Sequence, residues 1–70
     1  MTPTTQKENQ KPYLENGYNY VAILVYGNEY YIKHFKTRLQ AVKYNWDNLG
    51  GGGDVLTTRQ AIKKYEFLTL

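Results

Sequence analysis

Hydrophobic and aromatic residues are densest in residues 18–26, a run with the sequence YNYVAILVY that lies between Gly17 and Gly27. The run is rich in β-branched and aromatic residues and is too short for a typical helix, so it predicts a β-strand. Gly27 and Asn28 are suited to a two-residue hairpin turn because both residue types tolerate positive φ. Residues 29–36 are then the return strand of a β-hairpin.

The two-residue turn also predicts the register of the hairpin. Tyr26 lies opposite Glu29, and side chains that are paired across the strands share a face of the sheet. One face is aliphatic at its centre and consists of Val21, Ile23, Val25, Tyr30, Ile32 and His34. The other face is aromatic and carries one lysine; it consists of Tyr18, Tyr20, Ala22, Leu24, Tyr26, Tyr31, Lys33 and Phe35.

The hydrophobic period changes after the hairpin and predicts a helix over residues 38–49. Thr37 and Gln40 have the spacing of a capping box, in which each side chain bonds the backbone N–H of the other residue. Apolar residues recur at helical spacing, at Leu39, Val42, Trp46 and Leu49. We expect this stripe to cover the aliphatic face of the hairpin. The four glycines of residues 50–53 are interpreted as a flexible hinge.

The last segment predicts a short strand at residues 55–56, a short helix over residues 58–65 and an extended chain to Leu70. The helix start is supported by a second Thr-x-x-Gln capping box, from Thr57 to Gln60. Residues 65–70 alternate imperfectly, so their pattern alone does not establish a strand.

Residues 1–12 are almost entirely polar and are predicted to form a flexible tail, because they contain too little apolar surface to offset the entropy of ordering. Residues 13–70 are predicted to form a single α+β domain. Its expected architecture is a β-hairpin or three-stranded antiparallel sheet, with one helix packed on one face and a short helical and extended C-terminal segment.

The composition argues against an enzyme. The chain has 70 residues, a formal net charge of +3, no cysteine and a single histidine, His34. Serine is also absent, so no Ser or Cys nucleophile exists, and we expect no catalytic residues, no metal site and no cofactor. No apolar run approaches the roughly 20 residues of a membrane span. We therefore expect a cytoplasmic protein that does not associate with membranes.

The positive charge indicates nucleic acid as a candidate partner. Residues 1–16 carry as many acidic as basic side chains, so the net charge lies in the remainder of the chain. Two clusters could contact phosphates in a salt-sensitive manner. They consist of Lys33, Lys36 and Arg38, and of Arg59, Lys63 and Lys64. A basic nucleic-acid-binding or regulatory module is the first functional hypothesis, with DNA favoured over RNA.

The aromatic residues form a second candidate surface. Tyrosine, phenylalanine and tryptophan make up 16% of the chain, more than a small core needs. The predicted register places Tyr18, Tyr20, Tyr26, Tyr31 and Phe35 on the face away from the first helix. Three explanations stay open for this aromatic face: the C-terminal segment covers it, a protein partner binds it, or nucleotide bases stack on it.

The second functional hypothesis is therefore a protein-binding inhibitor or adaptor, of a phage or mobile-element type, that acts through the tyrosine-rich sheet face. A second copy of the chain is a further candidate partner. The uncharged strand of residues 18–26 would be an open sheet edge if the C-terminal segment does not pair with it, and open edges pair with other chains.

The strand-to-helix junction carries a family resemblance. Phe35, Thr37 and Ala41 match the pattern F-x-T-x-x-x-A that closes the last strand of AP2-type and integrase arm-type β-sheet DNA-binding domains, and the similar region covers about half of the chain. Such domains lay a three-stranded sheet in the major groove of DNA. The resemblance implies that Lys33, Tyr31 and Arg38 contact DNA.

Overall fold

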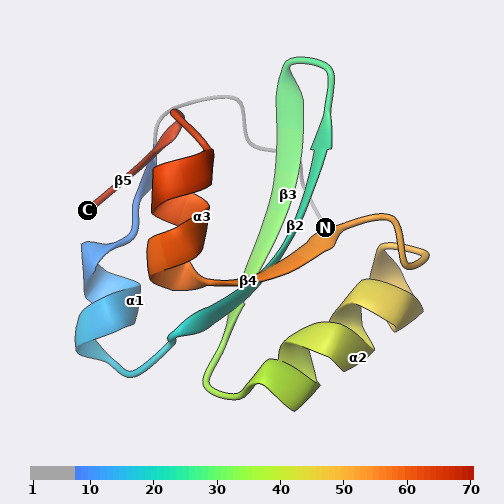
Figure 1. Ribbon diagram of the computed structural model, residues 1–70, viewed down its shortest axis with the longest axis horizontal. Helices are drawn as coiled ribbons and strands as arrows, with labels where there is room; N and C mark the ends of the chain where they lie inside the picture. Colours follow the sequence, from blue (N-terminus) through green and yellow to red (C-terminus); the bar gives the residue numbers. More distant parts are fainter. Residues whose placement is uncertain (1–7) are drawn as a thin grey trace.

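The computed structural model describes residues 8–70, which form short strands and helices (Figure 1). In chain order they are β1 (Glu8–Asn9), α1 (Lys11–Glu15), β2 (Tyr20–Tyr26), β3 (Glu29–Phe35), α2 (Arg38–Asn48), β4 (Asp54–Thr57), α3 (Thr58–Lys64) and β5 (Leu68–Thr69). A three-stranded antiparallel sheet with helices packed on it confirms the α+β class. No helix within residues 8–70 has both the length and the apolar character needed to span a membrane.

The predicted hairpin register is confirmed. Tyr26 pairs with Glu29, and the pairing continues to Tyr20 and Phe35 at the other end of β2 and β3. Gly27 has the positive φ, +62°, that the tight turn requires. The register follows from the turn, because a two-residue loop leaves only one way to pair the residues that flank it.

Strand β2 is central rather than an open edge. It pairs with β3 on one side and with β4 on the other, in the order β3-β2-β4. Residues 18–26 are expected to be an open edge only if the C-terminal segment does not pair with them, and because it does pair with them, this route to a homodimer is closed. The C-terminal segment supplies the missing neighbour, because β4 follows the glycine loop directly and pairs antiparallel with β2.

Helix α2 packs on the opposite face of the sheet from the one predicted. Strands β3 and β4 are both antiparallel to β2 and hence parallel to each other, so α2 is the crossover of a β-α-β unit. Such connections are right-handed. In the strand order β3-β2-β4, a right-handed connection from β3 to β4 passes over the face that carries Ala22, Leu24 and Phe35. The contact of Phe35 with Tyr44 of α2, 5.3 Å between ring centroids, confirms this placement.

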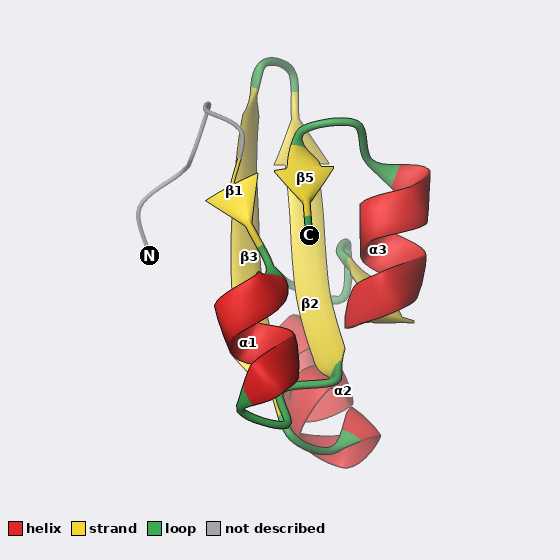
Figure 2. Ribbon diagram, turned by 90° about the vertical axis from the view of Figure 1, so that its left-hand side faces the viewer, coloured by secondary structure: helices red, strands yellow, loops and turns green. Residues whose placement is uncertain are grey.

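The C-terminal segment covers the aliphatic face instead. Helix α3 and the small β1-β5 sheet lie on one side of the main sheet, and α2 lies on the other (Figure 2). The buried core between the sheet and the C-terminal segment consists of Val21, Ile23, Tyr30, Ala61 and Leu68. Ile62 and Phe67 pack around it. The predicted elements themselves are confirmed, including the capping box between Thr57 and Gln60.

The buried side of α2 also differs from the predicted stripe. Its inward residues are Ala41 and Asn45, whereas Leu39 and Trp46 are 77% and 67% exposed. A small residue at position 41 lets the helix lie close to the sheet. The apolar stripe therefore does not face the sheet but lies to one side of the sheet-facing residues. The crossover connection, rather than hydrophobicity alone, determines how α2 is oriented.

The glycine segment is a bonded turn rather than a hinge. The backbone carbonyl of Asn45 accepts the N–H of Gly51 at 2.9 Å, and its side-chain oxygen accepts the N–H of Gly53 at 2.9 Å. Gly51 has φ +75° and lies beneath the Trp46 ring. Two glycines are thus held by one buried asparagine.

The ordered part of the fold begins before the predicted boundary at residue 12. The N–H groups of Glu8 and Gln10 donate to the carbonyls of Phe67 and Thr69, at 3.0 and 2.6 Å, which pairs β1 parallel with β5. The Tyr30 hydroxyl donates to a Glu8 carboxylate oxygen at 3.1 Å, and burial together with this carboxylate raises the pKa of Tyr30 to about 12. Residues 1–7 of the predicted tail lie outside the described residues.

Candidate functional site

Helix α2 covers only part of its sheet face and leaves a trough beside it. The trough is a cavity of about 420 Å³. It is lined by residues from β2, β3 and α2 with its following turn, namely Leu24, Tyr26, Tyr31, Tyr44, Asn48 and Leu49. The tyrosine trough, as we call this cavity, lies between the sheet and the C-terminal end of α2.

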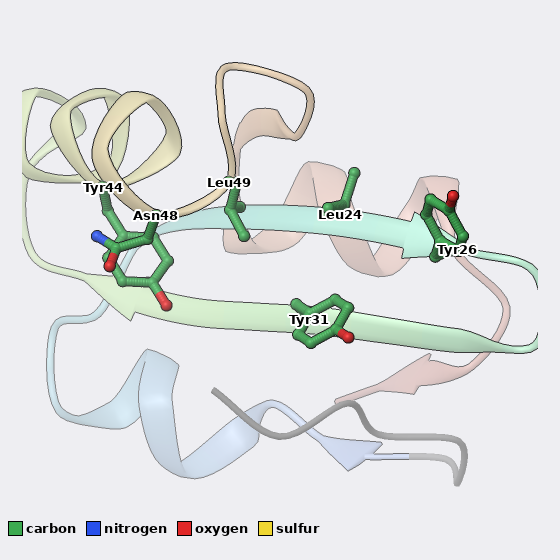
Figure 3. Close-up of a pocket in the computed structure, with 6 residues that line it drawn as sticks. All are labelled: Leu24, Tyr26, Tyr31, Tyr44, Asn48 and Leu49. Carbon is green, nitrogen blue, oxygen red and sulfur yellow. The ribbon is translucent and has the colours of Figure 1, made fainter.

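The walls of the tyrosine trough are aromatic (Figure 3). Tyr26 stands at one end and Tyr44 at the other, with Tyr31 along the β3 side. Leu24 and Leu49 lie along the opposite side. Tyr26 is 76% exposed at the tip of the hairpin. Rings around an apolar floor can stack on planar groups, and the phenol hydroxyls add hydrogen-bonding capacity at the rim.

Two further depressions adjoin the trough at Tyr44. One has a volume of about 610 Å³ and lies between β3 and the N-terminal segment, with Glu8, Tyr13 and Lys33 in its wall. The other has a volume of about 300 Å³ and lies over Phe35 and Lys43. Tyr44 lines all three cavities, and we refer to the three together as the groove along β3 and α2.

One member of the first predicted basic cluster, Lys33, lines this groove. Lys33, Lys36 and Arg38 are all exposed, and the Lys36 Nζ lies 5.2 Å from the centroid of the Tyr18 ring. Lys43 is a fourth exposed cation in this region, which the sequence analysis missed. Within residues 8–70, none of these four cations takes part in an ion pair. Acidic side chains do share these depressions, since Glu8 lines one of them with Lys33 and Asp47 lines the other with Lys43.

The second predicted basic cluster is not part of the groove. Arg59, Lys63 and Lys64 belong to α3, which packs on the other face of the sheet. Lys64 forms an ion pair with Asp54 at 2.9 Å. Hydrogen bonds from Tyr65, whose hydroxyl lies 2.5 Å from the Asp54 carboxylate, and from Lys64 lower the pKa of Asp54. The six predicted phosphate contacts therefore do not form one surface, and among them Lys33 lines the groove.

The five residues of the predicted aromatic face have different environments. Tyr26 and Tyr31 line the trough, and Phe35 packs against Tyr44. Tyr18 meets the ring of Tyr13 edge-on, at 6.3 Å between centroids, and Tyr20 is half-buried. The C-terminal segment lies on the opposite face, so the explanation that it covers the aromatic face is wrong. Helix α2 covers part of that face, and the trough remains open.

The His34 ring packs against and bonds neighbouring side chains of the fold. Its ring stacks on Tyr13 with 3.5 Å between centroids, and its Nε2 is hydrogen-bonded to the side-chain oxygen of Gln10. The Gln10 amide nitrogen donates to the Glu8 carbonyl, so the proton of this bond is carried by the imidazole. Burial, and to a lesser extent the charge of Lys33, lowers the pKa of His34 to about 4. Among residues 8–70, no three His, Cys, Asp or Glu side chains are grouped as metal ligands would be.

The missed groove residues depend on the placement of α2. Tyr44 and Asn48 lie on the side of α2 that faces β3, next to the buried Ala41. The sequence could have indicated these two residues only if Ala41, rather than the apolar stripe, had been taken to face the sheet. Comparisons with protein-family models, with curated proteins and with solved structures give no match for the chain.

Proposed function

We propose that this protein is a small basic binding module without catalytic activity that holds single-stranded nucleic acid in the groove along β3 and α2. Unpaired bases stack on Tyr31 and Tyr26 in the trough, and the phosphates pass Lys33 and Lys43. The observation that carries the proposal is the tyrosine trough itself, an open aromatic cavity flanked by lysines that form no ion pair within the described residues.

The energetics of stacking support a role for the trough. A base stacked on an aromatic side chain contributes about 1–3 kcal/mol, and this contribution tolerates any base because every base has a π-face. The exposed Tyr26, the half-buried Tyr31 and a few lysines therefore account for moderate, salt-sensitive affinity with little sequence preference.

The partial cover of the sheet favours unpaired strands over a duplex. The resemblance to AP2-type domains implies a sheet face laid in the major groove, which would require an open sheet face. Helix α2 lies across the face that carries Tyr31 and Lys33. A flexible single strand can follow the remaining groove past Tyr44, whereas a rigid duplex would meet the helix.

The proposal is tested by fluorescence anisotropy with labelled oligonucleotides of about twelve nucleotides, as single-stranded DNA, single-stranded RNA and duplex DNA. We expect binding of single strands and a loss of about tenfold in affinity for Tyr31→Leu, since one stacking contact is removed. Tyr31→Phe is the matched control and retains the affinity because it keeps the ring. Equal affinity of the Leu and Phe variants, or no binding at low salt, contradicts the proposal.

A protein partner is the second candidate function, and the exposure of the hairpin tip favours it. Val25 and Tyr26 are 39% and 76% exposed at the end of β2, and tyrosine is enriched among residues that anchor protein interfaces. An inhibitor or adaptor would use the same tyrosine face. Its mark is a protein complex that Tyr26→Ala abolishes while the fold is retained, together with no response to nucleic acid in the anisotropy measurement.

A further inference from the structure

One flank of α2 is apolar and uncovered. Leu39 and Trp46 are mostly exposed, and Val42 between them is half-buried. Their spacing of three and four residues places them along one side of the helix. Tyr44, on the other side, contacts Phe35 of β3. The apolar flank, as we call the set Leu39, Val42 and Trp46, therefore faces away from β3, toward the side of the sheet where β4 lies.

Strand β4 is the edge of the sheet below this flank. No element within residues 8–70 pairs with its outer side. The N–H of Thr58 donates to the Asn19 carbonyl at 2.7 Å. In an antiparallel pair, residues whose backbone groups bond the neighbouring strand alternate with residues whose backbone groups face away from it. The backbone groups of Leu56 thus face β2, whereas those of Val55 and Thr57 face outward.

Val55 provides the free backbone groups of this edge. The N–H of Thr57 already donates to the Gln60 side chain at 3.1 Å, so Val55 presents the outward donor and acceptor. Proteins commonly protect such edges with charged side chains or proline. The one charged residue of β4, Asp54, is instead paired with Lys64, which leaves the edge without a free charge.

We propose that two copies of this chain associate about a two-fold axis at Val55. The β4 strands pair antiparallel, so that the Val55 N–H of each copy donates to the Val55 carbonyl of the other. The two three-stranded sheets then form one continuous six-stranded sheet, and the apolar flanks of the two α2 helices meet above it. This surface lies away from the groove along β3, so the inference does not depend on the proposed function.

The spacing of the elements fits this arrangement. Adjacent strands lie about 4.8 Å apart, and α2 packs mainly over β2 and β4. The two α2 axes would then lie about 10 Å apart, close to the distance of packed helices. Because the two-fold axis makes the helices antiparallel, Leu39 of each copy faces Trp46 of the other.

Charge complementarity favours a second copy as the occupant. Arg38 lies at the N-terminal end of α2, where the helix dipole disfavours a cation, and α2 has no basic residue in its last turn. In the antiparallel pair, Arg38 of each copy lies near the C-terminal end of the other copy's α2, where a cation is favourable. A strand from a different protein that paired with β4 would bond only the free backbone groups of Val55 and would leave the apolar flank exposed.

The mass of the whole chain in solution tests the proposal, measured by sedimentation equilibrium over a range of concentrations. We expect the mass to rise from 8.2 kDa to twice that value as the concentration increases. Leu39→Lys should weaken association by at least about tenfold, because the charge would be buried at the apolar flank. Gln40→Lys is the matched control, since it adds the same charge next to position 39 but outside the flank, and it should leave association unchanged.

Two further measurements keep the proposal testable if one variant is uninformative. Val55→Pro removes the outward N–H and should also yield a monomer. Trp46 is the only tryptophan of the sequence, and its emission should shift to the blue as the dimer forms. A monomer at all concentrations with unchanged Trp46 emission overturns the proposal. So does a dimer that Leu39→Lys and Val55→Pro leave intact, because it would use another surface.

Discussion

The side-chain oxygen of Asn45 accepts the backbone N–H of Gly53 at 2.9 Å, and this bond joins α2 to the start of β4. Asn45 is buried, and its backbone carbonyl holds Gly51 as well. A polar residue on the inward side of the helix thus secures the turn that returns the chain to the sheet. Gly53 has no room for a side chain, because a Cβ would lie 2.8 Å from this same oxygen.

Asn45→Ala should lower the free energy of unfolding by about 1–3 kcal/mol, because the Gly53 N–H would lose its partner in a part-buried position. Urea denaturation measures the effect as a lower midpoint at an unchanged slope. Asn48→Ala, one turn later and exposed, is the control and should remain within about 0.5 kcal/mol of the parent protein. Equal losses in the two variants would show that the bond to Gly53 does not secure the turn.

Gly51→Ala tests the contact between the glycine turn and Trp46. A Cβ at position 51 would lie 2.5 Å from the Trp46 ring, and φ is +75° there. Gly50→Ala shares the positive φ, at +61°, but meets nothing within 4 Å. Both variants should lose about 1 kcal/mol from backbone strain. Only Gly51→Ala should also displace the ring and change the Trp46 emission in dilute solution, and an unchanged emission would contradict the described packing.

The hairpin and the helix ends could be predicted from sequence because local chemistry determines them. The Gly27 turn fixes the pairing of β2 with β3, and the Thr37 and Thr57 caps fix where α2 and α3 begin. The helical spacing of the apolar residues correctly indicated that Leu39 and Trp46 share one side of α2. It could not tell whether that side faces the sheet, because the right-handed crossover between β3 and β4 selects the covered face.

The candidate site was partly predictable for the same reason. Tyr26, Tyr31 and Lys33 share a face that follows from the hairpin register alone. Tyr44 and Lys43 join them only because α2 packs on that face, which is a non-local property of the fold. The separation of the two basic clusters has the same origin, since α3 covers the opposite face.

Stability should fall between about pH 6.5 and pH 4 because of His34. Its pKa is lowered from an ordinary value of 6.5 to about 4 in the folded protein, so the unfolded chain binds more protons in this range. The loss should be about 1–2 kcal/mol, once solvent screening of the half-buried ring is allowed for. Thermal unfolding at several pH values measures it. In His34→Gln this component should disappear, whereas an undiminished pH dependence would assign it to other groups.

The salt dependence of oligonucleotide binding should separate the two basic clusters. Each phosphate neutralised on a single strand contributes about 0.7 to the slope of log affinity against log salt concentration. Lys33→Gln should therefore reduce the slope by about 0.7, because Lys33 lies beside the groove. Lys63→Gln removes the same charge from α3, on the other side of the sheet, and should leave the slope unchanged. Anisotropy titrations at several salt concentrations measure both slopes. An equal reduction in the two variants would mean that net charge, rather than the groove, attracts the strand.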